Sequence, residues 1–127
     1  MRQAWLPATP RGAPMARAIV RESAAALGLD SATTWELTLA TTEAFANAVE
    51  HGSPCDPRGI QLRMELAGGC VYMEIADCGR FESTQTRKPE GHGGRGITII
   101  SALMDDLEVV PDRGTTRVRF GKRVALA

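Results

Sequence analysis

The sequence lacks the features that mark several large classes of protein. Its three cysteines, Cys55, Cys70 and Cys78, are widely spaced and form no C-x-x-C pair, so we expect small packing residues rather than a disulfide framework or a zinc site. Aromatic residues make up only 5% of the chain, and 15 basic residues balance 15 acidic ones. This balance provides no attraction to nucleic acid or to an anionic membrane surface.

Long hydrophobic runs are also missing. No apolar stretch approaches the length that spans a membrane, and the first residues show neither the apolar core nor the cleavage site of a secretory signal. We therefore expect a cytoplasmic protein that binds neither nucleic acid nor membrane directly.

What the chain does have is enough apolar material for one core. Hydrophobic residues make up 43% of 127 residues, which favours a single domain over residues 1–127. The turn-rich stretches 52–59 and 81–96 are predicted as loops inside that domain. The second is long enough to be a lid or a binding loop.

Three helices are predicted. Thr9 and Pro10 are typical of an N-cap and a first-turn proline, and they begin a helical pattern that ends at Gly28. A longer helix begins at Asp30, or at Thr33 with a capping box, and runs to about residue 51. A third, over residues 97–104, follows a glycine-rich loop.

Alternating residues predict four strands. In residues 60–66 and 71–75 every second residue is apolar, so these side chains share one face of a strand. The turn at residues 67–69 joins the two strands as a hairpin. Residues 107–110 and 115–120 form a second pair. The resulting fold class is an α+β two-layer sandwich, with a mixed, mainly antiparallel sheet and helices packed on one face.

A polar stripe follows the second helix. Glu43, Asn47 and His51 are spaced by four residues and share one side, with Glu36 and Glu50 close to it. Such a stripe is commonly a solvated helix face. The alternative is that Asn47 offers an oxygen to a magnesium ion while Glu43 positions or deprotonates a nucleophile near a terminal phosphate.

Two further polar side chains are predicted to face the interior. The inward series of the second strand continues onto Asp77, and a buried carboxylate must be neutralised, paired or hydrogen-bonded. An arginine or backbone amides could do so, and so could the amino group of adenine. Gly79 would let the chain turn closely against the base. By alternation, Thr116 faces the same interior.

Four glycines lie within residues 91–96, directly before the third predicted helix. Backbone N–H groups at a helix N-terminus suit phosphate oxygens, although a plain flexible loop is the alternative. A dinucleotide-binding fold is rejected because no strand directly precedes the glycines, and no Walker A signature is present.

Taken in order, four segments resemble the N, G1, G2 and G3 boxes of the GHKL ATPases. They are Glu43-x-x-x-Asn47-Ala48-x-x-His51-Gly52, Asp77-x-Gly79, Gly94-x-Gly96-Ile97 and Gly114-Thr115-Thr116. The likeness covers nearly the whole chain. The short length, the ending of the first box and residues 96–109 look like the anti-sigma-factor serine kinases of the bacterial stress and sporulation switches. One departure is Phe81, where many members have a second glycine.

The resemblance implies a Bergerat-type ATP-binding fold with ATP and Mg²⁺ as cofactors. It assigns the following roles: Glu43 as catalytic base, Asn47 as magnesium ligand, Asp77 with Gly79 as adenine site, Gly94, Arg95, Gly96 and Ile97 as phosphate loop and lid, Thr116 and Thr115 as support for the base through a water, and His51 as the end of the nucleotide-binding box. Whether Lys88 of the lid reaches a phosphate stays open.

The activity implied is that of a protein serine/threonine kinase that acts as an anti-sigma factor. Such a protein phosphorylates an anti-anti-sigma partner of the STAS type, sequesters an RNA polymerase sigma factor, and forms a homodimer. A non-catalytic module that binds ATP to order its partner-binding surface is the alternative. A detached catalytic half of a histidine kinase is less expected, because no phosphoacceptor helical hairpin precedes the domain in this sequence.

Overall fold

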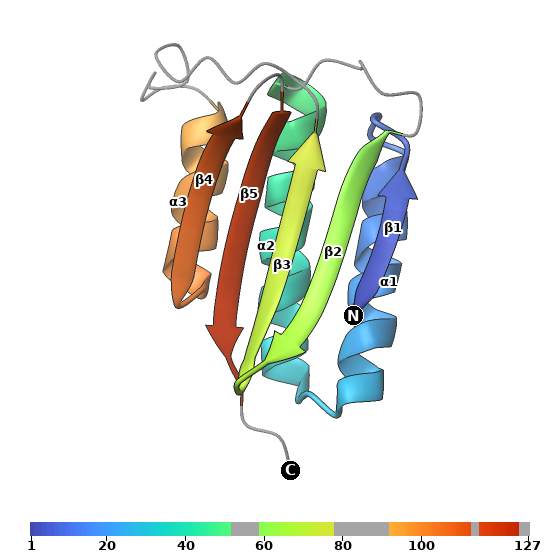
Figure 1. The fold of residues 1–127 in the computed structure, drawn as a ribbon, viewed down its shortest axis with the longest axis vertical. Coiled ribbons are helices and arrows are strands. Elements are labelled where there is room, and N and C mark those ends of the chain that lie inside the picture. Colours follow the sequence, from blue (N-terminus) through green and yellow to red (C-terminus); the bar gives the residue numbers. More distant parts are fainter. Residues whose placement is uncertain (52–58, 78–91, 113–114, 125–127) are drawn as a thin grey trace.

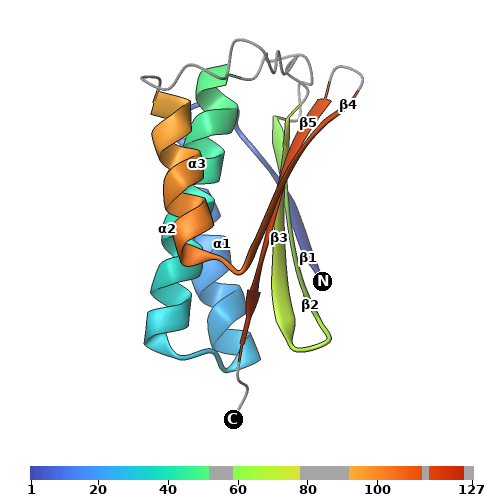
Figure 2. The same ribbon diagram turned by 90° about the vertical axis from the view of Figure 1, so that its left-hand side faces the viewer.

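Three helices cover one face of a five-stranded sheet (Figures 1 and 2). The computed structural model describes residues 1–51, 59–77, 92–112 and 115–124. Their order is β1 (Arg2–Leu6), α1 (Gly12–Leu27), α2 (Ser31–His51), β2 (Ile60–Ala67), β3 (Cys70–Asp77), α3 (His92–Leu103), β4 (Asp106–Asp112) and β5 (Thr115–Arg123). The predicted two-layer α+β class is confirmed.

The strands lie in the order β1-β2-β3-β5-β4, and each of these four pairings is antiparallel. The sheet was expected to be mixed, and among the described strands it is antiparallel throughout. The predicted hairpins are present, with Met64 opposite Met73 in β2–β3 and Val109 opposite Val118 in β4–β5. Alternate residues of β2, β3 and β5 are buried against the helices, as expected for a sheet covered on one face.

Strand β1 was not predicted. It pairs with β2, from Arg2 opposite Met64 to Leu6 opposite Ile60, and Leu6 is only 1% exposed. Within its five residues apolar and polar side chains do not alternate. The strand therefore forms because it pairs with β2, and its own sequence pattern does not predict it.

Helix α1 begins later than predicted. Thr9 and Pro10 form a turn, in which their carbonyl oxygens accept hydrogen bonds from Gly12 and Ala13, and the helix starts at Gly12. The end at Gly28 is confirmed, because this residue has a left-handed φ of 76° that favours glycine. The buried side chains of α1 are small ones, Ala16, Val20 and Ala24, which let the helix lie close to the sheet and to α2.

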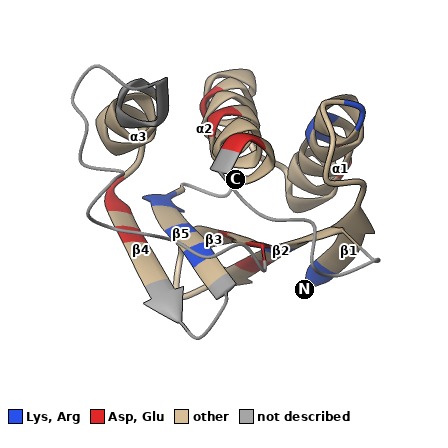
Figure 3. Ribbon diagram, turned by 90° about the horizontal axis from the view of Figure 1, so that it is seen from above, with Lys and Arg blue, Asp and Glu red and all other residues tan. Residues whose placement is uncertain are grey.

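Helix α2 is the middle helix of the layer, between α1 and α3 (Figure 3). Asp30 is its N-cap: the Thr33 N–H donates to Asp30 Oδ1 at 2.7 Å, and this bond holds the pKa of the Asp30 carboxyl below its usual value. The Asp30 alternative is therefore confirmed over a cap at Thr33. Leu37, Ala40 and Phe45 of this helix are buried in the core.

The far end of α3 is held by a charged side chain. Lys122 Nζ of β5 donates to the carbonyl oxygen of Leu103 at 3.0 Å and lies 3.0 Å from Glu36 Oε1 of α2. One ammonium group therefore satisfies a carbonyl at the C-terminal end of α3 and connects it to α2. This contact fixes α3 beside α2 at the end opposite to its glycine-rich start.

One buried hydroxyl on α2 lies in an unfavourable environment. Thr41 is fully buried, and its Oγ1 has no hydrogen-bond partner among the described residues. We expect Thr41→Val to raise the free energy of unfolding by about 1 kcal/mol, because it removes an unsatisfied polar atom without changing the branching of the side chain. Urea denaturation measures this difference.

Thr38→Val is the matched control for that substitution. The Thr38 hydroxyl donates to the carbonyl oxygen of Thr34 at 2.6 Å, so its removal is expected to bring no such gain. If Thr41→Val instead lowered stability, the Thr41 hydroxyl would have a partner, such as a bound water, and the interpretation would be wrong.

The remaining sequence expectations concern cysteines and membranes. Cys70 is a free, half-buried thiol at the start of β3, whereas Cys55 and Cys78 lie outside the described residues. In the part of the chain that the structure describes, no helix is both long and apolar enough to cross a bilayer.

Candidate functional site

Four elements end at the same edge of the molecule. The C-terminal ends of α2 and β3 meet there with the N-terminal ends of α3 and β5, at the top of Figure 1. Segments from distant parts of the chain therefore come together at one edge. They are residues 43–51, 77, 92–97 and 115–116. Among the described residues, the candidate site residues predicted from the sequence lie toward this edge.

The closest approach in this region is between α2 and α3. Glu43 and Asn47 lie one turn apart on α2 and are half-buried, while Gly96 of α3 is buried opposite them. A Cβ atom on Gly96 would lie 3.1 Å from Asn47 Nδ2, 3.2 Å from Asn47 Oδ1 and 3.3 Å from Glu43 Oε1. These distances are shorter than ordinary van der Waals contact. The lack of a side chain at Gly96 therefore lets α3 lie directly against both polar groups.

The chemistry of this trio differs from that of a solvated helix face. A half-buried carboxylate can take up a proton or position a hydroxyl, and a carboxamide oxygen is a ligand for a hard cation. Both groups lie against the start of α3, where the helix dipole is positive and favours negative charge. The site thus combines a candidate base, an oxygen ligand and a surface suited to anions.

The glycine-rich segment is placed differently from the sequence prediction. It was expected to be a loop before a helix at residue 97, but α3 begins at His92, so Gly94, Arg95 and Gly96 lie within the helix. The N–H groups at the start of an α-helix have no intrahelical partner, and in α3 these groups belong to the turn that begins at His92. Gly96 and Ile97 come later; Gly96 gives the close approach described above, and Ile97 is a partly buried residue packed against the core.

The other half of the candidate site lies at the end of the sheet. Asp77, the last residue of β3, is directly opposite Thr116 of β5, so both side chains project from the same face. That face is the one covered by helices, because Ile75 and Val118, next in the same series, are 0% and 7% exposed. Thr116 is 5% exposed and Asp77 is half-buried. The predicted inward direction of both residues is confirmed.

Several predicted site residues cannot be placed in this way. Gly79 and Lys88 lie outside the described residues. His51 is the last residue of α2, and Thr115 is the first residue of β5, opposite Asp112. The structure describes the backbone at these two positions, at Gly94 and at Arg95.

The oxygen atoms of this site fit a metal ion that is held mainly by a bound nucleotide and only in part by the protein. Among the described residues, no group of three or more histidine, cysteine, aspartate or glutamate side chains is placed to hold a metal. Magnesium bound with a nucleotide needs only one or two protein oxygens, since phosphates and water complete its shell. Asn47 Oδ1, which would lie 3.2 Å from a Cβ atom at Gly96, is an oxygen of the right kind.

One relation in the site was missed at the sequence level. The glycines were interpreted only as phosphate-binding residues, whereas Gly96 also allows α3 to pack against Glu43 and Asn47. The sequence did contain a signal for close helix packing, because a glycine, Gly96, directly precedes the apolar part of the helix. Its neighbour across the interface could not be found without knowing how α2 and α3 pack.

Known proteins share this architecture. A family model described as a histidine kinase-like ATPase domain matches residues 6–122. An anti-sigma F factor of Thermoanaerobacter pseudethanolicus is 29% identical over 120 residues, which cover 86% of this chain and 83% of that protein. The serine-protein kinase RsbW of Listeria innocua is 27% identical over 127 residues, covering 89% and 81% of the two chains.

A solved structure extends the comparison to three dimensions. The crystal structure of the RsbU and RsbW domains of a Mycobacterium tuberculosis protein matches 97% of this chain with a TM-score of 0.78 and 28% sequence identity. This chain spans only 32% of that longer chain, so the likeness concerns one part of it.

Proposed function

This chain belongs to the histidine kinase-like ATPase domain family, and we propose that it is an ATP-dependent protein serine/threonine kinase that acts as an anti-sigma factor. In this proposal a single ATP-binding domain, working as a homodimer, phosphorylates an anti-anti-sigma antagonist of the STAS type and sequesters an RNA polymerase sigma factor. The names of relatives that are 27% and 29% identical support the assignment.

The observation that carries the proposal is the contact between Gly96 and the pair Glu43 and Asn47. A module that only bound nucleotide would need an oxygen for the metal and donors for the phosphates. It would have no need of a carboxylate held at the same point, because a base is required only if a nucleophile is activated. The placement of Glu43 therefore favours phosphoryl transfer over binding alone.

Each residue of this group has a defined task in the proposed reaction. Bound ATP supplies the phosphoryl group that is transferred. Asn47 Oδ1 holds the magnesium ion that accompanies it, and the N–H groups of the first turn of α3, including those of Gly94 and Arg95, donate to phosphate oxygens. Glu43 Oε1 accepts the proton of the substrate hydroxyl or orients that hydroxyl. Ile97 keeps this turn in place by packing against the core.

Recognition of the base is assigned to the end of the sheet. The Asp77 carboxylate can only accept hydrogen bonds, which matches the amino group of adenine, and Thr116 beside it supports the base through a water, with Thr115 as its neighbour. Gly79, Lys88 and His51 are assigned to the nucleotide by the family resemblance of the sequence alone.

The direct test is phosphotransfer to a purified STAS-type protein encoded near this chain. With radiolabelled ATP and Mg²⁺, we expect phosphoserine or phosphothreonine to form on that protein, and the unphosphorylated partner to release a sigma factor from this chain. If ATP binds but no phosphate is transferred to any such partner, the non-catalytic module becomes the better account. If ATP does not bind, the whole proposal fails.

The close approach at Gly96 gives a second test. We expect Gly96→Ala to leave the free energy of unfolding within about 1 kcal/mol of the parent, because the gain in helix propensity offsets the tight contact. Displacement of Glu43 and Asn47 is expected to slow phosphotransfer by about tenfold to a hundredfold. Single-turnover kinetics and urea denaturation measure the two effects separately.

Ser101→Ala, at an exposed position of α3, is the control for that variant. It changes helix propensity in the same helix without approaching α2, so phosphotransfer should be unchanged. Normal transfer in Gly96→Ala would show that the contact with Glu43 and Asn47 does not matter to the reaction.

A further inference from the structure

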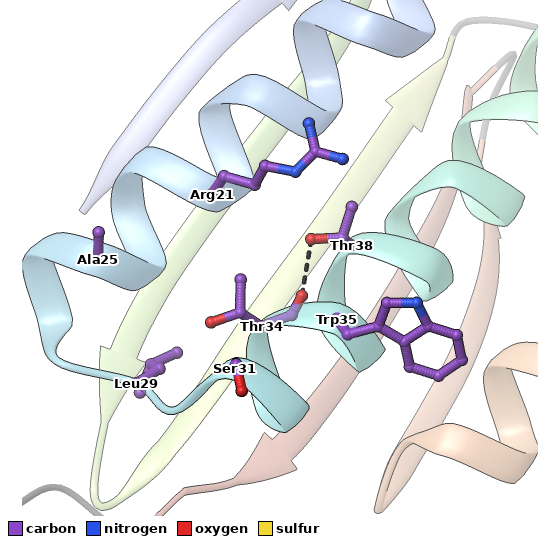
Figure 4. A pocket seen from close by; sticks show the side chains of 7 residues that line it. All are labelled: Arg21, Ala25, Leu29, Ser31, Thr34, Trp35 and Thr38. Carbon is purple, nitrogen blue, oxygen red and sulfur yellow. Dashed lines mark hydrogen bonds between the residues drawn. The ribbon is translucent and has the colours of Figure 1, made fainter.

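A groove lies between α1 and α2, away from the site described above. It has a volume of about 420 Å³ and is lined by Arg21 and Ala25 of α1, Leu29 of the connection, and Ser31, Thr34, Trp35 and Thr38 of α2. Figure 4 shows these side chains: the Arg21 guanidinium extends from α1 toward α2, the Trp35 ring points away from α1, and the strands lie behind the two helices. The groove therefore opens on the outer surface of the helix layer.

The most unusual residue of this groove is Trp35. Its side chain is 62% exposed, although a tryptophan of this size would bury a large apolar area if it were covered. Trp35 precedes Glu43 by eight residues of helix, which corresponds to about 12 Å along α2. Among the described residues, Trp35 belongs neither to the hydrophobic core nor to the candidate site described above.

The charge of the groove comes from Arg21 alone. Arg21 makes no ion pair with any residue that the structure describes, and no acidic residue is among the lining side chains. The acidic residues nearest in sequence are engaged elsewhere: Glu22 with Arg2 at 3.5 Å, Glu36 with Lys122 at 3.0 Å, and Asp30 with the Thr33 N–H at 2.7 Å. The groove thus pairs an exposed aromatic surface with an uncompensated positive charge.

We propose that this groove docks an acidic amphipathic helix of a protein partner. Apolar side chains of that helix pack on Trp35 and, separately, on Ala25, and a carboxylate pairs with the Arg21 guanidinium (Figure 4). Tryptophan and arginine are the residue types that most often dominate binding energy at protein interfaces, and a groove between two helices accepts a third helix through its apolar face. The carboxylate is required by charge complementarity, because arginine forms two parallel hydrogen bonds with it.

A second copy of this chain fits the same surface less well. In a symmetric dimer each protomer presents the same patch, so contact through this groove would bring two Arg21 side chains together without an acidic partner in the lining. The inference does not depend on the proposed kinase activity, because the groove lies at the opposite end of α2 from Glu43 and Asn47.

The test uses two blocked, alanine-rich helical peptides of about four turns. One carries leucine and glutamate on a single face, and the other has lysine in place of each glutamate. Each is titrated, without nucleotide, into a Trp5→Phe variant, in which Trp35 is the remaining tryptophan. Tryptophan emission gives the affinity, and amide chemical shifts in NMR spectra map the contact.

We expect the acidic peptide to bind, to shift the Trp35 emission and to perturb amides on both sides of the groove. Arg21→Glu should weaken this binding by about tenfold and confer binding of the lysine peptide, and Trp35→Ala, followed by NMR, should weaken it by a similar factor. Both positions are exposed, so thermal melting should be unchanged in both variants.

Four outcomes would overturn the proposal. They are absence of binding by the acidic peptide at millimolar concentration, equal binding of the two peptides, chemical-shift changes confined to other surfaces, and an unchanged preference in Arg21→Glu. Self-association that sedimentation velocity shows to be lost in Trp35→Ala would identify a second copy as the occupant instead. Failure of ATP binding or phosphotransfer would leave this result unaffected.

Discussion

Glu43→Gln is expected to slow phosphotransfer by about a hundredfold to ten-thousandfold, the range usual for loss of a general base. Glutamine keeps the shape of the side chain and its place against Gly96, but its amide cannot take up the proton of the substrate hydroxyl. Binding of ATP and ADP should stay within a small factor of the parent, because the metal and phosphate contacts belong to Asn47 and to the first turn of α3. Calorimetry and single-turnover transfer measure binding and chemistry separately.

The control is Glu50→Gln on the same helix. Glu50 lies seven residues beyond Glu43, on nearly the same side of α2, but it is exposed. The same chemical change is therefore made at an exposed position away from the contact with Gly96, and transfer should be unaffected. If Glu43→Gln transferred phosphate at the parental rate, Glu43 would have no part in proton transfer, and positioning alone would have to explain the reaction.

The three glutamates of this stripe show what sequence spacing could and could not predict. Glu36, Glu43 and Glu50 repeat every seven residues, so periodicity places all three on one side of α2. In the structure Glu36 pairs with Lys122, Glu43 meets Gly96, and Glu50 is exposed. The stripe was predictable because it is a local property of the helix. The environments of Glu36 and Glu43 were not, because each depends on a residue at least 50 positions further along the chain.

The same distinction explains the successes and errors in the fold. Helix α2 and the β2–β3 hairpin were predicted because the cap at Asp30, the alternation and the turn glycines act within a few residues. Strand β1 was missed because its specification comes from pairing with β2, nearly 60 residues away. The start of α1 was misplaced because a local turn at Thr9 and Pro10 precedes the helix. The start of α3 was misplaced because the glycines, which are poor helix formers, were interpreted as a loop although they lie within the helix.

Alternation in the strands was sufficient to predict half of the candidate site. The direction of Asp77 and Thr116 followed from counting by twos along β3 and β5, and their pairing places them side by side. The strand pattern could not reveal the helix layer that covers them or the approach of α3 to α2. Four short motifs in order grouped the site residues through resemblance to a family, but the contact between α3 and α2 was found only in the structure.

Asp77→Asn is expected to weaken ATP binding by about tenfold to a hundredfold, the loss typical of a hydrogen bond to a charged group. The carboxylate accepts from the adenine amino group in the proposed site, whereas an asparagine there brings a donor of its own and a weaker acceptor. The side chain keeps nearly the same volume at its half-buried position, so the melting temperature should change little. Calorimetric titration of Mg-ATP and ADP measures the affinity.

The control for this substitution lies on the same strand. Glu74 points to the opposite face of the sheet, where it pairs with Arg117 at 3.4 Å and with Arg63 at 3.7 Å. Glu74→Gln should therefore leave nucleotide affinity unchanged.

Inosine triphosphate shows whether the lost interaction is the one proposed. It presents a carbonyl oxygen where adenine has its amino group, so the parent should discriminate against it and Asp77→Asn should discriminate much less. If the variant lost affinity for both nucleotides equally, Asp77 would support the pocket rather than recognise the base. If ATP affinity were unchanged, the inward carboxylate would be a structural residue, and adenine recognition would have to come from elsewhere in the chain.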